Sequence, residues 1–225
     1  MNQKFCGDSR DLFKYDLIYT IMKKLPELAS FTFIPMLTPV YQTKTMKAGQ
    51  DNEKLIKLFS PFSGENGAEL YFHEIQHLFE SEGIKTTILN NNQFTRKGRI
   101  EYFEKIIENL PENSLIFFDP DTGLREKNPT EEHMKFSELL EVYKKSSPSS
   151  LLMVYQHYPR VCTSEERTNF PSKKSQEIGE FIQKVPVTIS DGGILFFFLT
   201  KNSNLQKKLE TVLEVYSKKY EMFFA

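Results

Sequence analysis

Apolar residues follow two patterns along this chain. Near the N-terminus they recur every three or four positions, at Leu12, Phe13, Leu17, Ile18, Ile21, Met22 and Leu25. That spacing is typical of an amphipathic helix, and the Asp and Ser residues in front of it are preferred helix caps. By contrast, residues 115–118 form an unbroken apolar run, Leu-Ile-Phe-Phe. Such a run is typical of a strand that is buried on both faces of a parallel sheet.

The two patterns alternate through the rest of the chain. We expect helices over 12–25, 68–82, 99–110, 136–145, 172–184 and 205–220. We expect strands over 31–37, 84–89, 115–118, 151–156, 185–189 and 194–200. The alternation predicts an α/β fold, Rossmann-like, with a mostly parallel sheet and helices on both faces. Ser190-Asp-Gly-Gly193 lies between the last two strands and predicts a C-terminal antiparallel hairpin.

A polar stretch over 38–67 interrupts this alternation. It contains Gly49, Pro61, Gly64 and Gly67, and only 52–59 has a helical pattern. At 225 residues the chain is the size of a single domain. We therefore expect one α/β domain over 1–225 with a long loop insertion at about 38–67, a kind of loop that is often functional.

The composition of the chain excludes few kinds of binding partner. The formal net charge is -1, and the lysine pairs are scattered, so nothing requires a polyanionic partner. The two cysteines, Cys6 and Cys162, lack metal or disulfide-framework spacing. No stretch approaches the roughly 20 apolar residues of a membrane span. We expect a cytoplasmic, soluble protein with no membrane partner.

The most informative polar motif is Asp119-Pro-Asp-Thr-Gly123, directly after the apolar run. Burying a carboxylate there costs several kcal/mol, of order 2–7 for a polar group, unless a partner is supplied. Asp119 and Asp121 are therefore candidate catalytic residues, as a base or an acceptor for an amino substrate, with Pro120 beside them. Alternatively, both carboxylates bind Mg²⁺ or Mn²⁺ in a nuclease or phosphohydrolase, helped by Asp8 or Glu126. The simpler interpretation is a type I turn.

Charged residues also gather at the start of the first helix. Gly7, Asp8, Asp11 and Lys14 are candidate substrate- or cofactor-binding residues. The alternative is a capped helix in which Asp11 and Lys14 form a surface ion pair at i,i+3.

A third candidate group follows the 151–156 strand. His157 is a candidate catalytic residue that could move a proton, Gln156 a candidate binding residue, and Arg160 a candidate phosphate ligand. In a parallel sheet this strand end lies beside the Asp119 loop. The alternative for His157 is an ordinary hydrogen-bonded residue at a strand end.

His73-Glu-Ile-Gln-His77 matches the H-E-x-x-H pattern of zinc hydrolases. However, Tyr71, Phe72, Ile75, Leu78 and Phe79 form an apolar stripe on the same expected helix, which leaves both histidines on the opposite, solvated side. The sequence therefore favours an ordinary amphipathic helix, and we assign no metal-binding residues.

Several of these motifs together resemble a known family, the large-subunit ribosomal RNA adenine methyltransferase J, which has the class I methyltransferase fold. That family opens with Gly-x-x-x-Asp-x-x-Lys-His, matched here by Gly7, Asp11 and Lys14, with Tyr15 in place of the histidine. Its catalytic Asp-Pro-Pro-Tyr corresponds to residues 119–122, its aromatic-rich turn to 155–159, and its small-residue hairpin to 190–193.

The resemblance implies a methyltransferase-like fold, a nucleic acid or nucleotide-like substrate, and S-adenosylmethionine as cofactor. Asp119 would orient the acceptor amine, Asp11 and Lys14 would line the pocket, and His157 would assist. The chain departs from the family where a glycine-rich loop should follow the first strand, because residues 34–39 contain no glycine. It also has asparagines at 90–92 where an acidic residue is expected. There are two alternatives: a metal-dependent nuclease or phosphohydrolase, and a non-catalytic binding module that uses the 38–67 loop.

Overall fold

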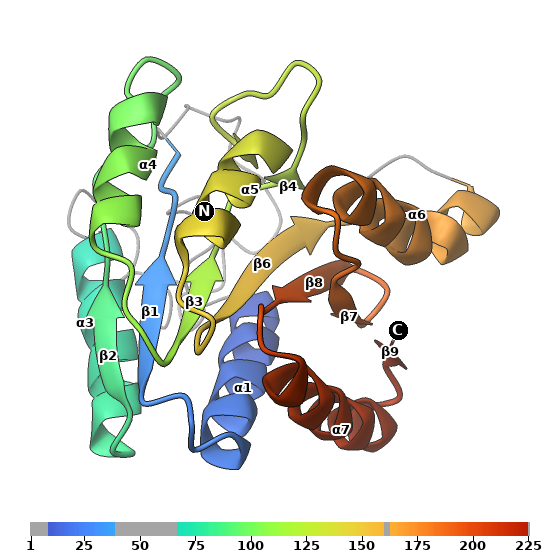
Figure 1. Ribbon diagram of the computed structural model, residues 1–225, viewed down its shortest axis with the longest axis horizontal. Coiled ribbons are helices and arrows are strands. Elements are labelled where there is room, and N and C mark those ends of the chain that lie inside the picture. The colour runs from blue at the N-terminus through green and yellow to red at the C-terminus, as the bar shows by residue number, and fades with distance from the viewer. Residues whose placement is uncertain (1–8, 39–66, 160–162, 225) are drawn as a thin grey trace, which may run out of the picture.

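The computed structural model describes residues 9–38, 67–159 and 163–224. The candidate residues Gly7, Asp8 and Arg160, the expected helix at 52–59 and nearly all of the expected loop insertion lie outside these ranges. Within them the chain forms an α/β structure (Figure 1). Its helices are α1 (Ser9–Lys24), α3 (Gly67–Ser81), α4 (Arg99–Glu108), α5 (Phe136–Lys145), α6 (Ser164–Ile182) and α7 (Ser203–Tyr220).

A seven-stranded sheet forms the centre, in the order β2-β1-β3-β6-β8-β7-β9. Its strands are β1 (Ser30–Ile34), β2 (Lys85–Ile88), β3 (Ser114–Phe118), β6 (Leu151–His157), β7 (Val187–Ser190), β8 (Ile194–Leu199) and β9 (Phe223–Phe224). The first four are parallel, and β8 is antiparallel to both β6 and β7. The prediction of a Rossmann-like, mostly parallel sheet with a C-terminal antiparallel hairpin is confirmed.

The strand order reverses at β1. The chain passes from β1 to β2 on one side and then returns to place β3 on the other side. The arrows of β1, β3 and β6 point the same way, so their carboxyl ends form one edge of the sheet (Figure 1). In open α/β sheets ligands bind at such a reversal, outside the carboxyl ends of the strands.

Helices cover both faces of the sheet and create two separate apolar cores. Leu115 and Phe117 of β3 pack in the core with α1, α3 and α7, whereas Ile116 and Phe118 pack in the core with α4, α5 and α6. Successive strand residues point to opposite faces, so the unbroken apolar run of β3 supplies both cores. This confirms helices on both faces.

The last two long strands are joined by a tight turn. The Asp191 Oδ1 atom accepts hydrogen bonds from the backbone N–H groups of Gly193 at 2.7 Å and Ile194 at 2.8 Å. Gly192 has a φ of 83°, a conformation that favours glycine. The hairpin follows from local turn chemistry.

Several elements differ from the sequence prediction. Helix α6 begins at Ser164 rather than at 172, because Thr163 and Glu166 form a capping box and Pro171 lies inside the helix. A proline usually marks a helix boundary, so the prediction placed the start of the helix after Pro171. Strand β9 and the two-stranded sheet of β4 (Gly123–Leu124) and β5 (His133–Met134) were not predicted, since two residues carry no periodic signal.

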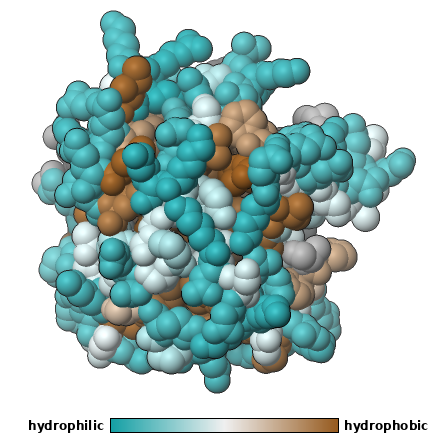
Figure 2. Space-filling model, viewed as in Figure 1, coloured by the Kyte–Doolittle hydropathy of each residue, from teal (hydrophilic) through white to brown (hydrophobic). Residues whose placement is uncertain are grey.

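Polar side chains cover most of the face shown in Figure 2, and apolar ones form scattered patches there. Among the described residues, no helix combines the length and apolar character needed to cross a lipid bilayer.

Candidate functional site

An ammonium group lies between two carboxylates at the carboxyl edge of the sheet. The Lys14 Nζ atom is 2.9 Å from Asp119 Oδ2 and 3.0 Å from Asp11 Oδ1. All three residues are buried, and Asp119 is only 1% exposed. The interpretation of Asp11 and Lys14 as a surface ion pair is therefore wrong. The helix and strand motifs that the sequence singled out separately meet in one site, which we call the Lys14 network.

Local geometry explains why these residues meet. The Asp119 N–H donates to the Ile34 carbonyl at 3.0 Å, which continues the β1–β3 ladder by one residue. Because strand side chains alternate, Asp119 faces the same side as Phe117, the side covered by α1. Asp11 and Lys14 are one turn apart on α1 and therefore share a helix face. The result places Asp119 at the reversal between β1 and β3.

Tyrosine hydroxyls extend the network on the helix side. The Tyr71 hydroxyl on α3 donates to Asp11 Oδ2. The Tyr15 hydroxyl is 3.0 Å from the Tyr71 hydroxyl. The Tyr71 hydroxyl has one proton, and a hydrogen bond to a charged carboxylate is stronger than one to a neutral hydroxyl. We therefore assign this proton to the hydrogen bond with Asp11, which makes Tyr15 the donor to the Tyr71 oxygen. The hydroxyls of Tyr15 and Tyr71 therefore form a series of hydrogen bonds that ends at the Asp11 carboxylate.

An aromatic residue of β6 closes the other side. The Lys14 Nζ atom lies 4.5 Å from the centroid of the Tyr155 ring, a cation–π distance. The Tyr155 hydroxyl is 2.9 Å from His157 Nε2. Half-buried His157 is therefore connected to the Lys14 network through Tyr155.

Neighbouring charges set the protonation of the network. Burial by itself lowers the pKa of Lys14, but the charges of Asp119 and Asp11 outweigh it, and the pKa is raised above its ordinary value. Burial raises the pKa of Asp119, and the repulsion from Asp11 adds to this, while Lys14 opposes it in part. Burial and the adjacent Tyr15 and Asp11 raise the pKa of Tyr71. At neutral pH Lys14 is therefore charged and Tyr71 is a neutral donor.

The loop after Asp119 is fastened to β6 by Gln156. The Gln156 Oε1 atom accepts from the Leu124 N–H at 2.8 Å, and its Nε2 atom donates to the carbonyls of Thr122 at 3.1 Å and His157 at 2.9 Å. Gly123 has a φ of 116°, and a Cβ there would lie 2.4 Å from the Gln156 side chain. Glycine is required by this close approach. Gln156, predicted to bind substrate, holds the Asp119 loop in place.

The other members of the loop lie around this anchor. Pro120 is buried and Asp121 is half-buried. Glu126, an alternative metal ligand, accepts from the backbone N–H of Ser137 at 3.2 Å and so lies at the start of α5. Within the described ranges no group of three or more His, Cys, Asp or Glu side chains is arranged to hold a metal ion.

The histidines of the H-E-x-x-H match lie on the exposed side of α3. The His73 side chain is 75% exposed, and its ring stacks near that of His77. Tyr71, Phe72, Ile75 and Phe79 form the buried stripe, but Leu78 is 53% exposed, so the predicted stripe was too wide by one residue.

The residues after β1 do not fit S-adenosylmethionine held by a glycine-rich loop. Met36 and Leu37 fill this region with buried side chains, and the Met36 N–H donates to the Tyr102 hydroxyl at 3.2 Å. At the end of β2, the Asn90 side chain donates to the Tyr102 carbonyl at 3.1 Å. Both places where the resemblance implies cofactor contacts, the backbone after β1 and the residue after β2, form hydrogen bonds with Tyr102 of α4 instead.

A second buried ion cluster lies on the opposite face of the sheet. The Arg99 guanidinium contacts the Glu138 carboxylate and the backbone carbonyls of His133 and Thr130. It also lies 4.6 Å from the ring centroid of Phe94. Sequence reasoning gave no indication of this group, which we call the Arg99 cluster.

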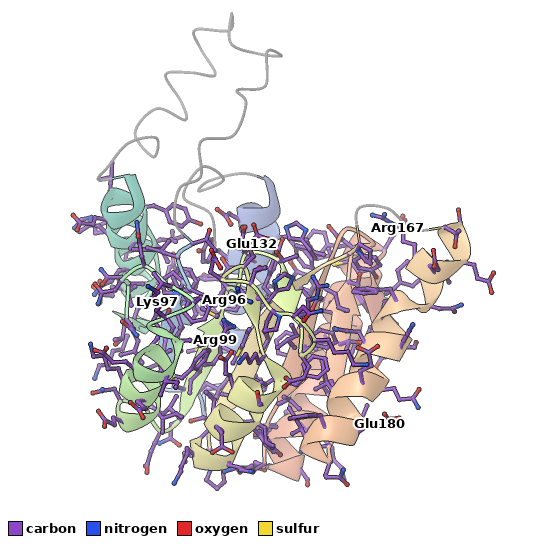
Figure 3. All side chains as sticks on the ribbon, turned by 90° about the horizontal axis from the view of Figure 1, so that it is seen from above. Arg96, Lys97, Arg99, Glu132, Arg167 and Glu180 are labelled. Atoms are coloured by element: carbon purple, nitrogen blue, oxygen red, sulfur yellow. The ribbon has the colours of Figure 1, made fainter. Side chains whose placement is uncertain are left out.

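The labelled basic side chains of the described ranges do not form one continuous stripe (Figure 3). Figure 3 views the molecule from above, where Arg96, Lys97 and Arg99 lie together at the start of α4. Arg167 lies apart on α6, and Glu132 lies between the two groups. The Arg167 side chain donates to the Gly192 carbonyl at 3.0 Å.

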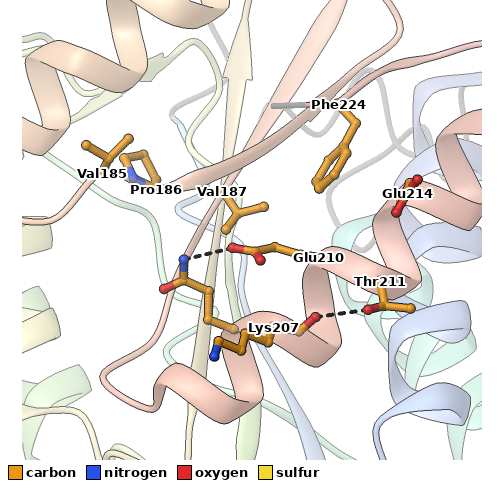
Figure 4. Close-up of a pocket in the computed structure, with 9 residues that line it drawn as sticks. Val185, Pro186, Val187, Lys207, Glu210, Thr211, Glu214 and Phe224 are labelled. Carbon is orange, nitrogen blue, oxygen red and sulfur yellow. Dashed lines mark hydrogen bonds between the residues drawn. The ribbon is translucent and has the colours of Figure 1, made fainter.

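A separate pocket lies between α7 and β7 (Figure 4). Its lining residues pair with each other: Gln206 donates to Glu210 at 2.9 Å, and Thr211 donates to the Lys207 carbonyl at 3.1 Å. It contains none of the predicted site residues.

The structure thus brings Asp11, Lys14 and Asp119 into direct contact and places His157 one residue away, behind Tyr155. Tyr71 and Tyr155 were missed by the sequence reasoning, although a tyrosine in an apolar stripe signals a buried hydroxyl that needs a partner. Comparison of the chain with protein-family models, with curated proteins and with solved structures finds no match.

Proposed function

We propose that this chain is an enzyme on a methyltransferase-like scaffold that acts on an amino group of a nucleic acid or nucleotide-like substrate. The observation that carries the proposal is the buried Asp119 carboxylate, held by Lys14 at the reversal of the strand order. The antiparallel hairpin at the end of the sheet supports the scaffold, since the resemblance implies the same feature.

Asp119 acts on the acceptor side of the reaction. Its carboxylate accepts a hydrogen bond from the substrate amine and so orients the nitrogen, while Lys14 fixes the plane of the carboxylate from the protein side. Because Asp119 is 1% exposed, the amine enters by displacing the groups that cover it. No step passes through S-adenosylmethionine, because the residues after β1 do not fit it.

A metal-dependent hydrolase is supported less well. A divalent cation would need the carboxylate oxygens of Asp119, but the Lys14 ammonium already contacts one of them and neutralises its charge. Glu126 lies at the start of α5, where Ser137 occupies its carboxylate.

A matched set of nucleosides tests the proposal. Adenosine and cytidine carry an exocyclic amine, whereas inosine and uridine carry a carbonyl at the same position. We expect calorimetric titration of the wild type to show at least about tenfold tighter binding of one amine-bearing nucleoside than of its partner, because the keto form has no exocyclic N–H to donate to the buried carboxylate.

The variant Asp119→Asn should lose this discrimination, since the amide carries no charge and can present N–H to the ligand. The matched control is Asp191→Asn in the β7–β8 turn, where the amide oxygen can still accept from the turn. It should bind like the wild type. A wild type that binds both members of each pair equally, or an Asp119→Asn variant that still discriminates, would refute the proposal.

A further inference from the structure

Four hydrogen-bonded or ionic steps connect a tyrosine on α1 to Asp119. Tyr15 donates to Tyr71, Tyr71 to Asp11, and the Lys14 ammonium binds both Asp11 and Asp119. Each step is a side-chain contact, and the two carboxylates share one cation. A change at Asp11 must therefore alter how strongly Lys14 binds Asp119.

We propose that Tyr71 is a positioning residue of the Asp119 site. Its hydroxyl holds and partly satisfies Asp11, so that the shared ammonium stays close enough to Asp119 to keep that carboxylate ionised. The proposal rests on the proposed function, because it assigns Asp119 as the group that meets the substrate.

The charges around Asp119 give the direction of the effect. The described titratable groups that face this network are Asp11, Lys14 and Tyr15 of α1, Tyr71 of α3, and Tyr155 with His157 of β6. Among these groups, two carboxylates share one ammonium. Without the Tyr71 hydroxyl, Asp11 loses a donor and attracts Lys14 more strongly. The Lys14 ammonium then interacts less strongly with Asp119, so Asp119 takes up a proton at higher pH.

The same helix offers a matched control. Tyr216 of α7 donates to Asp16 of α1 at 2.6 Å, so it is also a tyrosine–aspartate pair anchored on α1. Asp16 is exposed and forms none of the contacts of the Lys14 network described above. Removal of the Tyr216 hydroxyl therefore reports the structural cost of losing such a pair without the effect on Asp119.

The test is a titration of protein labelled with ¹³C at the aspartate carboxyl carbons. The Asp119 signal is identified by its loss in Asp119→Asn. We expect Tyr71→Phe to raise the midpoint of this signal by about half a pH unit or more, a modest fraction of the shifts of one to three units that a close charge produces. Tyr15→Phe should shift it in the same direction by less, and Tyr216→Phe should leave it unchanged.

A folded Tyr71→Phe variant with the wild-type midpoint would overturn the proposal, as would an equal shift in Tyr216→Phe. If Tyr71→Phe does not fold, Tyr15→Phe decides, and an unchanged midpoint there overturns it. Where the wild type binds an amine-bearing nucleoside, the pH below which affinity falls should move with the midpoint. A wild type that binds no nucleoside refutes the proposed function, whereas the carboxyl titration still decides the role of Tyr71.

Discussion

Two buried ion clusters lie on opposite faces of the same sheet. In the Arg99 cluster, one guanidinium faces one carboxylate and the Phe94 ring, and its remaining hydrogen bonds go to backbone carbonyls of the segment that includes β5. In the Lys14 network, one ammonium faces two carboxylates, and the further contacts are with side-chain hydroxyls and a ring. Among the described residues, the first pairs one carboxylate with one cation and is anchored to the backbone, whereas in the second two carboxylates share one cation.

We propose that this difference separates a structural role from a functional one. The Arg99 cluster connects α4 to α5 and to the loop before it, and the Glu138 carboxylate also accepts from the Lys135 N–H at 2.7 Å. Such a cluster stabilises one arrangement of the chain. The Lys14 network lies at the strand reversal, where ligands bind in this architecture. We propose that a donor-bearing ligand binds there to one of the two carboxylates that share the Lys14 ammonium.

The largest effect on stability should come from breaking the Arg99 cluster. Arg99→Met leaves the Glu138 carboxylate buried without its cation and removes one donor from each of the Thr130 and His133 carbonyls. We expect the free energy of unfolding to fall by about 3–5 kcal/mol, as measured by denaturant titration. Nucleoside binding at the temperature where the variant is folded should not change.

Arg99→Met combined with Glu138→Gln removes both charges and should recover part of the loss. A single variant as stable as the wild type, or one that loses nucleoside discrimination while folded, would contradict the assignment of a purely structural role.

A smaller effect concerns His133, whose carbonyl belongs to the Arg99 cluster. Burial, together with the charges of Arg125, Arg99 and Lys174, lowers the pKa of this imidazole to about 4. The folded state therefore holds the neutral ring, which lies 2.8 Å from the Thr130 hydroxyl. The unfolded chain binds a proton near pH 6.5. Stability due to His133 is thus complete above pH 6.5, is lost as the pH falls toward 4, and amounts to at most about 3 kcal/mol.

His133→Asn keeps an acceptor for Thr130 and removes the titration. The difference in unfolding free energy between wild type and variant should shrink or reverse from pH 6.5 to pH 4. A difference that stays constant across this range would show that His133 is not held neutral by its surroundings.

The comparison also explains what the sequence could predict. The unbroken apolar run before Asp119 predicted a buried strand and a carboxylate that needs a partner, and the i,i+3 spacing of Asp11 and Lys14 placed both on one helix face. The predicted helix over 136–145 coincides with α5. These conclusions rest on local patterns. Tyr71, by contrast, is 60 positions from Asp11, and only the packing of α3 against α1 brings the two together.

The Arg99 cluster was missed for a related reason. Arg99 and Glu138 are 39 positions apart and belong to different helices. An arginine near a helix start usually lies in solvent, so its burial depends on the β4–β5 segment that folds over it. The sequence pattern contains no sign of that segment because its strands are two residues long.

The most direct measurement is a crystal structure of the wild type soaked with the nucleoside that binds most tightly in the titrations. The account predicts that the exocyclic nitrogen lies within about 3.2 Å of an Asp119 carboxylate oxygen, the usual limit for such a hydrogen bond, with Lys14 still in contact with that carboxylate. A nucleoside bound elsewhere while the Lys14 network remains closed and unchanged would contradict it.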